Sequence, residues 1–138
     1  MKKTRTATAH WTGSGKEGKG HLSTASGALD QTAYDTRSRF EEGKLANPEE
    51  LIGAAHAGCF SMKLAFNLQE AGYTADDINT TAKVTIDNGE ITEIFLDTKV
   101  KVQQLNEEEF MKLAEHAKEN CPVSKLMNAK ISLTAALE

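Results

Sequence analysis

The feature that most constrains the fold is an uncharged stretch at residues 51–60, directly after a strong helix start. Asn47 is a good N-cap, Pro48 suits the first helical position, and Glu49 complements the positive end of the helix dipole. Within the stretch only His56 could carry a positive charge. A helix without a charged stripe has no face suited to water. The sequence therefore predicts a long central helix that is buried nearly all round.

The rest of the chain alternates between strand patterns and one amphipathic helix. Asn88-Gly89 is the strongest hairpin signal, because these residues favour a two-residue turn between antiparallel strands. Asn106 is a good N-cap for a helix over residues 107–120. The predicted strands cover residues 4–11, 21–26, 34–40, 77–87, 91–103 and 131–137. These patterns predict one α+β domain over residues 1–138.

A helix buried on every side is difficult to enclose in one small α+β domain, which offers it a single sheet. A second copy of the chain would supply the missing cover. We therefore expect a homodimer in which the two long helices pack together and sheets wrap around them. The alternative is a monomer with an unusually enclosed helix.

Charge and hydropathy exclude several classes of protein. The chain carries 16 basic and 20 acidic side chains, a formal net charge of −4, and no basic run, which disfavours nucleic-acid binding. No apolar stretch approaches the ~20 residues of a membrane span. The N-terminal residues lack the apolar core of a signal peptide. We expect a cytoplasmic protein whose two cysteines are reactive or merely buried thiols rather than a disulfide framework.

The two cysteines occupy chemically different positions. Cys59 lies within the central helix, where apolar surroundings raise the pKa of a thiol. Cys121 directly precedes Pro122 and so stands at a helix start, where the dipole favours a thiolate. Arg37 and Arg39 could supply a cation, and a dehydrated guanidinium needs a carboxylate to hold it.

Either of two adjacent carboxylates, Glu49 or Glu50, could hold that arginine. A set of two thiols, an arginine and a glutamate suits thiol redox chemistry. In that chemistry a thiolate attacks an electrophilic oxygen, becomes a sulfenic acid, and condenses with the second thiol to a disulfide.

Three other interpretations compete with redox chemistry. Two inert, packed cysteines are the commoner situation when spacing alone is considered. His56, three residues before Cys59, could form the Cys–His pair of a hydrolase, although side chains at this spacing rarely aim at each other. A metal site from Cys59, Cys121 and His56 would lack the short-spaced ligand pair of zinc sites.

Several motifs along the chain resemble the osmotically inducible protein C (OsmC) family, which is related to the organic hydroperoxide resistance proteins. The most specific are the block Asn-Pro-Glu-Glu-Leu-Ile-Gly-Ala-Ala-His-Ala at residues 47–57, the Cys-Phe-Ser-Met that follows at 59–62, and the Cys-Pro-Val-Ser at 121–124. Weaker matches are Ala-His-Trp at 9–11, Gly-Lys-Gly at 18–20 and Arg-Phe-Glu at 39–41.

The resemblance implies an intertwined homodimer, with two central helices wrapped by antiparallel β-sheets and active sites at the subunit interface. It implies a peroxidase that needs no cofactor or metal and prefers organic hydroperoxides. Cys59 would be the peroxidatic thiolate and Cys121 the resolving thiol. Arg39 would stabilise the thiolate, and Glu49, which directly follows Asn-Pro, would orient Arg39 in preference to Glu50. In relatives a dithiol of the lipoyl type reduces the disulfide.

The uncharged run around Cys59 also bears on specificity. A pocket lined by Phe60, Met62 or Leu51 would favour alkyl hydroperoxides over hydrogen peroxide. The implied role is defence against oxidative or osmotic stress. An alternative from another class of function is a non-catalytic dimeric module that binds an apolar small molecule.

Overall fold

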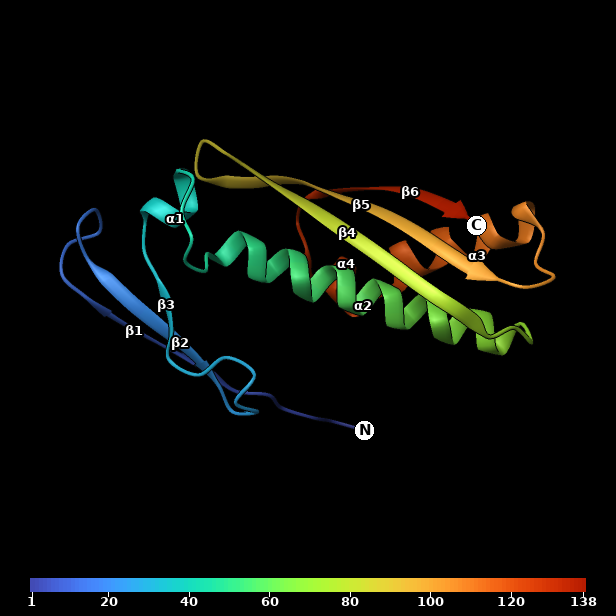
Figure 1. Ribbon diagram of the computed structural model, residues 1–138, viewed down its shortest axis with the longest axis horizontal. Coiled ribbons are helices and arrows are strands. Elements are labelled where there is room, and N and C mark those ends of the chain that lie inside the picture. The colour runs from blue at the N-terminus through green and yellow to red at the C-terminus, as the bar shows by residue number, and fades with distance from the viewer. The chain divides into compact units, whose positions relative to one another are not determined.

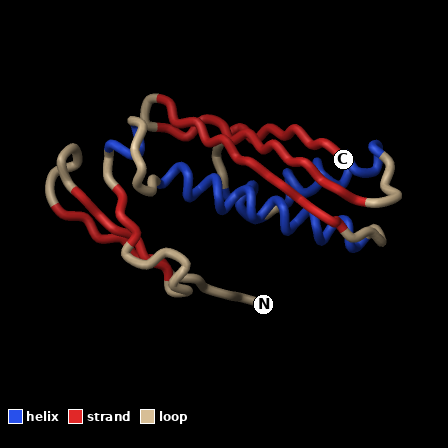
Figure 2. The backbone as a smooth tube through the Cα atoms, in the orientation of Figure 1, coloured by secondary structure: helices blue, strands red, loops and turns tan.

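The computed structural model describes residues 1–138, which form two compact units, Met1–Leu51 and Ile52–Glu138. The expectation of one domain over residues 1–138 stays a prediction. No helix is both long enough and apolar enough to cross a membrane. Figure 2 distinguishes the helices from the strands. In chain order the elements are β1 (Ala7–Thr12), β2 (Lys19–Thr24), β3 (Thr32–Tyr34), α1 (Arg37–Phe40), α2 (Pro48–Glu70), β4 (Ala75–Asp87), β5 (Glu90–Val102), α3 (Glu107–Asn120), α4 (Pro122–Leu126) and β6 (Lys130–Leu137).

The N-terminal unit contains a small antiparallel sheet in the order β1-β2-β3. Gly20 lies opposite both Trp11 and Tyr34, and a Cβ at Gly20 would come within 2.8 Å of each ring. Glycine therefore allows the two rings to approach to a centroid distance of 5.4 Å. No residue of this unit belongs to the buried apolar core of the chain.

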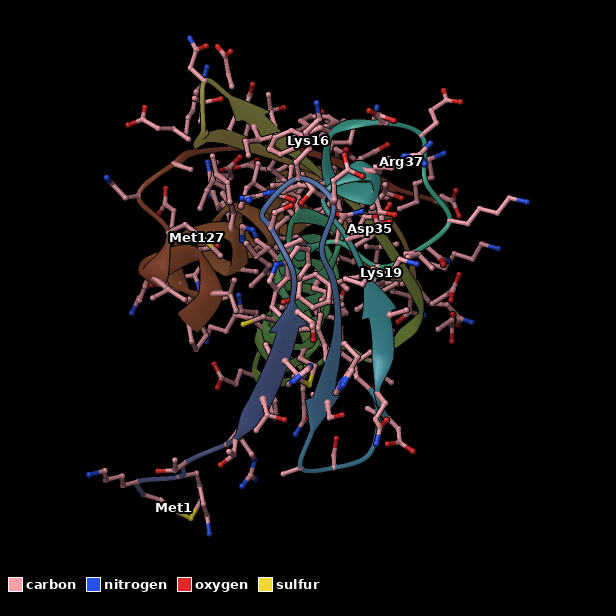
Figure 3. The ribbon with its side chains drawn as sticks, turned by 90° about the vertical axis from the view of Figure 1, so that its left-hand side faces the viewer. Met1, Lys16, Lys19, Asp35, Arg37 and Met127 are labelled. Carbon is pink, nitrogen blue, oxygen red and sulfur yellow. The ribbon has the colours of Figure 1, made fainter.

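The prediction of a strand over residues 34–40 is wrong beyond its first residue, because β3 ends at Tyr34 and residues 37–40 form the short helix α1. Asp35 Oδ1 accepts a hydrogen bond of 2.8 Å from the backbone N–H of Ser38, which turns the chain out of the sheet. This hydrogen bond, together with the charges of Arg37 and Lys19, holds the pKa of Asp35 below its usual value (Figure 3).

The long helix α2 begins where its sequence signals predict, and a glycine cap ends it. Asn47 Oδ1 accepts a hydrogen bond of 2.8 Å from the backbone N–H of Glu50. At the other end Gly72 has a φ of 92°, and the N–H of Tyr73 returns to the carbonyl of Leu68 at 2.8 Å. Local capping therefore determines the length of this helix.

The C-terminal unit has a three-stranded sheet in the order β4-β5-β6, with α2 running along it (Figure 1). Asn88 and Gly89 both have positive φ, 50° and 79°, as the turn between β4 and β5 requires. One face of β5 is buried at every second residue from Ile94 to Val102. The core combines that face with side chains of α2 and α3, among them the fully buried Phe60, Leu64, Leu68, Phe110, Ala114 and Ala117.

One strand pairing departs from the expected antiparallel sheets. β6 runs parallel to β5, with Ile94 opposite Ile131 and Val100 opposite Leu137. The connection between the two strands contains α3 and α4, and a crossover through helices returns the chain in the same direction. The other pairings in both sheets are antiparallel, as expected.

Within the single chain α2 is covered on one side only, and the expected second copy would have to cover the other. Met62 is 64% exposed and Phe66 is 59% exposed. The side of α2 that faces water also carries Ala54, Ala55 and Gly58. On the covered side burial continues past the uncharged stretch, because Leu64 and Leu68 are fully buried. Helix α2 therefore has two apolar faces, of which the chain itself covers one.

Candidate functional site

The structure brings the two cysteines together in the C-terminal unit. Cys59 lies in α2 and is half-buried, whereas Cys121 is the fully buried N-cap of α4. Both are free thiols, and Cys121 lies near enough to Cys59 to raise the pKa of the Cys59 thiol. The turn at Pro122 positions Cys121 against the helix that carries Cys59. Two positions far apart in the sequence thus form one dithiol.

Several groups act on the Cys59 sulfur in opposite directions. Burial raises the pKa of the Cys59 thiol, and the neighbouring Cys121 thiol raises it further. A hydrogen bond from the backbone N–H of Val123 acts in the other direction and lowers it. Because burial dominates, this unit by itself favours the neutral thiol, and a nucleophilic thiolate at Cys59 needs a cation in addition.

Cys121 is surrounded by hydrogen-bonding groups that sequence reasoning missed. The backbone N–H of Ser124 donates to Cys121 Sγ at 3.3 Å, and the Ser124 hydroxyl lies 3.1 Å from the same sulfur. Ser124 Oγ is also 2.7 Å from His56 Nε2. The Cys-Pro-Val-Ser motif contains Ser124, but no local signal indicates that it meets a histidine of α2.

His56 is fully buried, and burial lowers its pKa, so the imidazole is neutral at neutral pH. Its Nδ1 has no hydrogen-bond partner, and its Nε2 bonds to Ser124 rather than to Cys59. The Cys–His pairing of the hydrolase interpretation is therefore not formed. No group of three His, Cys, Asp or Glu side chains lies together as a metal site would require.

The predicted arginine and glutamate meet in the N-terminal unit. Arg39 Nε donates to Glu49 Oε1 at 2.8 Å, and the side chains are 39% and 9% exposed. Glu50, in contrast, is exposed. Arg37 pairs with Glu41 at 3.5 Å, and both of those side chains lie mostly in water. Of these two ion pairs, only Arg39–Glu49 is partly buried, and neither arginine pairs with Glu50.

Arg39 borders an open hollow of about 290 Å³ in the N-terminal unit. The aromatic rings of Trp11 and Tyr34 contribute to its wall, together with Pro48. The Arg39 guanidinium also lies 5.3 Å from the centre of the Phe40 ring. The hollow therefore combines a cation with apolar surface.

The expected lining of the substrate pocket is partly wrong. Phe60 is fully buried in the core of the C-terminal unit, so it cannot contact a substrate. Helical periodicity explains the error, because Phe60 lies on the face of α2 that packs against the sheet, whereas Met62 lies on the exposed face. Leu51 is half-buried.

Comparison with known proteins determines the family. Residues 41–136 match the family described as OsmC-like protein. Peroxiredoxin OsmC of Escherichia coli (strain K12) is 47% identical to this chain over 134 residues, 94% of each protein. The chain belongs to the OsmC family. The sequence-based prediction of the family is thereby confirmed.

Other OsmC relatives carry names that refer to organic hydroperoxides. Organic hydroperoxide resistance protein-like 1 of Staphylococcus epidermidis is 26% identical and covers 87% of each chain. The crystal structure of an organic hydroperoxide resistance protein from Elizabethkingia anophelis superposes with a TM-score of 0.74, at 27% identity over 100% of both chains. These matches confirm the OsmC-like α+β fold and agree with the expected activity, a thiol-dependent peroxidase.

Proposed function

We propose that the chain is a thiol-dependent peroxidase that reduces organic hydroperoxides, and more weakly hydrogen peroxide, with Cys59 as the peroxidatic and Cys121 as the resolving cysteine. The observation that carries the proposal is the pair of cysteines itself, two free thiols in one core cluster and near enough that Cys121 raises the pKa of Cys59. The names of the OsmC relatives support the same chemistry. The implied physiological role is defence against oxidative or osmotic stress.

The reaction has three steps. The Cys59 thiolate attacks the terminal oxygen of the hydroperoxide, the O–O bond breaks, and the alkoxide takes up a proton to leave as the alcohol. The Cys121 thiol then condenses with the Cys59 sulfenic acid, which releases water and forms the Cys59–Cys121 disulfide. An external dithiol, of the lipoyl type in the family, becomes oxidised as it returns the disulfide to two thiols. No bound cofactor takes part.

Arg39 and Glu49 complete the proposed catalytic set. The Arg39 guanidinium stabilises the Cys59 thiolate, whose pKa is otherwise raised by burial, and the negative charge that develops on the leaving oxygen. Glu49 holds the guanidinium through the 2.8 Å hydrogen bond at Nε. The aromatic wall beside Arg39 supports a preference for organic over hydrogen peroxide.

We also propose that two chains form a homodimer. The exposed apolar face of α2, with Met62 and Phe66, needs cover, and the N-terminal unit has no apolar core of its own. Sedimentation at the mass of two chains is the expected result. We place the protein in the cytoplasm, because two free thiols suit a reducing compartment.

Titration of free thiols after one equivalent of cumene hydroperoxide tests the function. Wild type should lose both thiols to an intrachain Cys59–Cys121 disulfide, which mass spectrometry locates. The matched variant Cys121→Ser should retain the first step and accumulate sulfenic acid or its over-oxidised products on Cys59. Survival of both wild-type thiols would contradict the proposal and favour a dimer that binds an apolar molecule without catalysis.

A further inference from the structure

A buried row of hydrogen-bonded polar groups leads from His56 to Cys121, and the three proposed reaction steps do not use it. It runs from His56 Nε2 to Ser124 Oγ over 2.7 Å, and from Ser124 Oγ to Cys121 Sγ over 3.1 Å. His56 and Cys121 are fully buried, and Ser124 is 8% exposed. All three residues belong to the C-terminal unit, on α2 and at the start of α4.

The state of Cys121 determines the direction of these hydrogen bonds. A thiolate can only accept, so the Ser124 hydroxyl must donate to Cys121 Sγ, alongside the Ser124 backbone N–H at 3.3 Å. Ser124 Oγ is then free to accept from His56 Nε2–H. With its proton on Nε2, the neutral imidazole leaves a lone pair on Nδ1.

The surroundings of His56 Nδ1 agree with that arrangement of protons. Nδ1 is buried and has no partner. An N–H left without an acceptor is rare inside proteins, so an unprotonated Nδ1 is the better fit to this position. A single arrangement of protons therefore satisfies both hydrogen bonds of Ser124 Oγ. In this arrangement the hydroxyl and the backbone N–H of Ser124 both donate to the Cys121 sulfur.

Both steps that involve Cys121 pass through its thiolate. In disulfide formation the Cys121 thiolate attacks Cys59 Sγ, the S–O bond of the sulfenic acid breaks, and the departing hydroxide takes a proton to become water. In disulfide reduction a thiolate of the external dithiol attacks Cys59 Sγ and forms a mixed disulfide, while the electron pair of the broken Cys59–Cys121 bond goes to Cys121 Sγ. The second thiol of the reductant then displaces Cys59, which takes up a proton as the reductant becomes a disulfide. Water cannot solvate the negative charge on the fully buried Cys121 sulfur, so protein donors must do so.

We propose that His56 and Ser124 are positioning residues for the resolving thiol: the relay His56 Nε2–H to Ser124 Oγ–H to Cys121 Sγ stabilises the Cys121 thiolate in disulfide formation and reduction. This rests on the proposed peroxidase function and assigns these residues to its second and third steps. The first step, at Cys59, does not use the relay.

Rapid-quench kinetics of a single turnover with cumene hydroperoxide separate the steps. In Ser124→Ala, oxidation of Cys59 should stay within about twofold of wild type, whereas disulfide formation should slow about tenfold, the effect of losing one hydrogen bond to a charged group. Because the sulfenic acid persists longer, more Cys59 should reach sulfinic acid. Ser124→Thr, which keeps the hydroxyl, should restore most of the rate.

The histidine is tested in the same assay. His56→Gln keeps an N–H donor and His56→Leu does not, so only the leucine variant should slow disulfide formation as Ser124→Ala does. Thr98→Val is the matched control, because it removes another buried hydroxyl, one that bonds within β4 and β5. It should leave both steps at wild-type rates.

Two results would overturn the relay. One is disulfide formation in Ser124→Ala and His56→Leu as fast as in wild type, and the other is equal slowing of both steps, which marks a packing role. If Ser124→Ala does not fold, equal rates in His56→Gln and His56→Leu overturn the relay in the same way. If wild type itself loses no thiols to the peroxide, the proposed function fails, and the relay fails with it.

Discussion

The cysteines and the arginine of the proposed catalytic set are held by different forces. Cys59 and Cys121 pack among fully buried side chains of α2, β5 and α3. Arg39 is 39% exposed and is held by Glu49, in a unit that contributes no residue to the apolar core. Apolar packing thus fixes the sulfur atoms, whereas polar contacts fix the guanidinium. The dithiol should therefore tolerate surface changes that disturb the arginine.

The largest expected effect tests the difference in burial. Phe110→Ala should lower the free energy of unfolding by about 3–5 kcal/mol, because the Phe110 side chain is fully buried in the C-terminal core. Phe40→Ala removes the same side chain from a 61% exposed position in the N-terminal unit and should cost less than about 1 kcal/mol. Urea unfolding measures the free energy of unfolding of both variants. Equal losses of that free energy would contradict the inferred difference in burial between the two units.

The second-largest expected effect tests the proposed role of the Arg39 guanidinium. Arg39→Ala should slow oxidation of Cys59 by cumene hydroperoxide about a hundredfold, since it removes the guanidinium that we propose stabilises the thiolate and the leaving oxygen. Burial raises the pKa of Cys59, and on the proposed role Arg39 offsets this effect, so its removal should move the pH midpoint of Cys59 alkylation upward.

Arg37→Ala is the matched control for the cation, because Arg37 is 78% exposed and pairs with Glu41 in water. Its rate and pH midpoint should equal those of wild type. An unchanged midpoint in Arg39→Ala would show that the arginine does not act on the Cys59 thiolate.

The smallest expected effect tests the proposed role of the Glu49 carboxylate in holding Arg39. Glu49→Gln should slow Cys59 oxidation about tenfold, because the amide keeps the shape of the side chain but weakens its hold on the guanidinium. Glu50→Gln changes the adjacent, exposed carboxylate and should stay within about twofold of wild type. Stopped-flow rates compare the two variants, and equal rates would exclude Glu49 as the residue that orients Arg39.

Local signals predicted much of the fold. The Asn47 cap, the Asn88-Gly89 turn and the helix over residues 107–120 are all present, since each depends on a few neighbouring residues. The strand pattern at residues 34–40 gave a wrong prediction, because the Asp35 carboxylate accepts a hydrogen bond from the backbone N–H of Ser38 and turns the chain out of the sheet. The parallel direction of β6 depends on the crossover through α3 and α4, which periodicity does not encode.

The site was predictable only in part. Residue chemistry left Glu49 and Glu50 open as partners of an arginine, and the structure bonds Arg39 to Glu49. The catalytic roles of Cys59, Cys121, Arg39 and Glu49 stay predictions. The contact between His56 and Ser124 joins positions 68 residues apart, and no local pattern indicates such a pair.

The unequal exposure of the two cysteines has a kinetic consequence. Cys121 is fully buried and Cys59 is not, so in the proposed mechanism peroxide and reductant both react at Cys59 Sγ. The reductant would thus donate its electrons to the same sulfur atom, Cys59 Sγ, that reduces the peroxide. The two substrates therefore exclude each other, and the enzyme should follow ping-pong kinetics in which a large excess of either one slows turnover by occupying the form of Cys59 that the other requires.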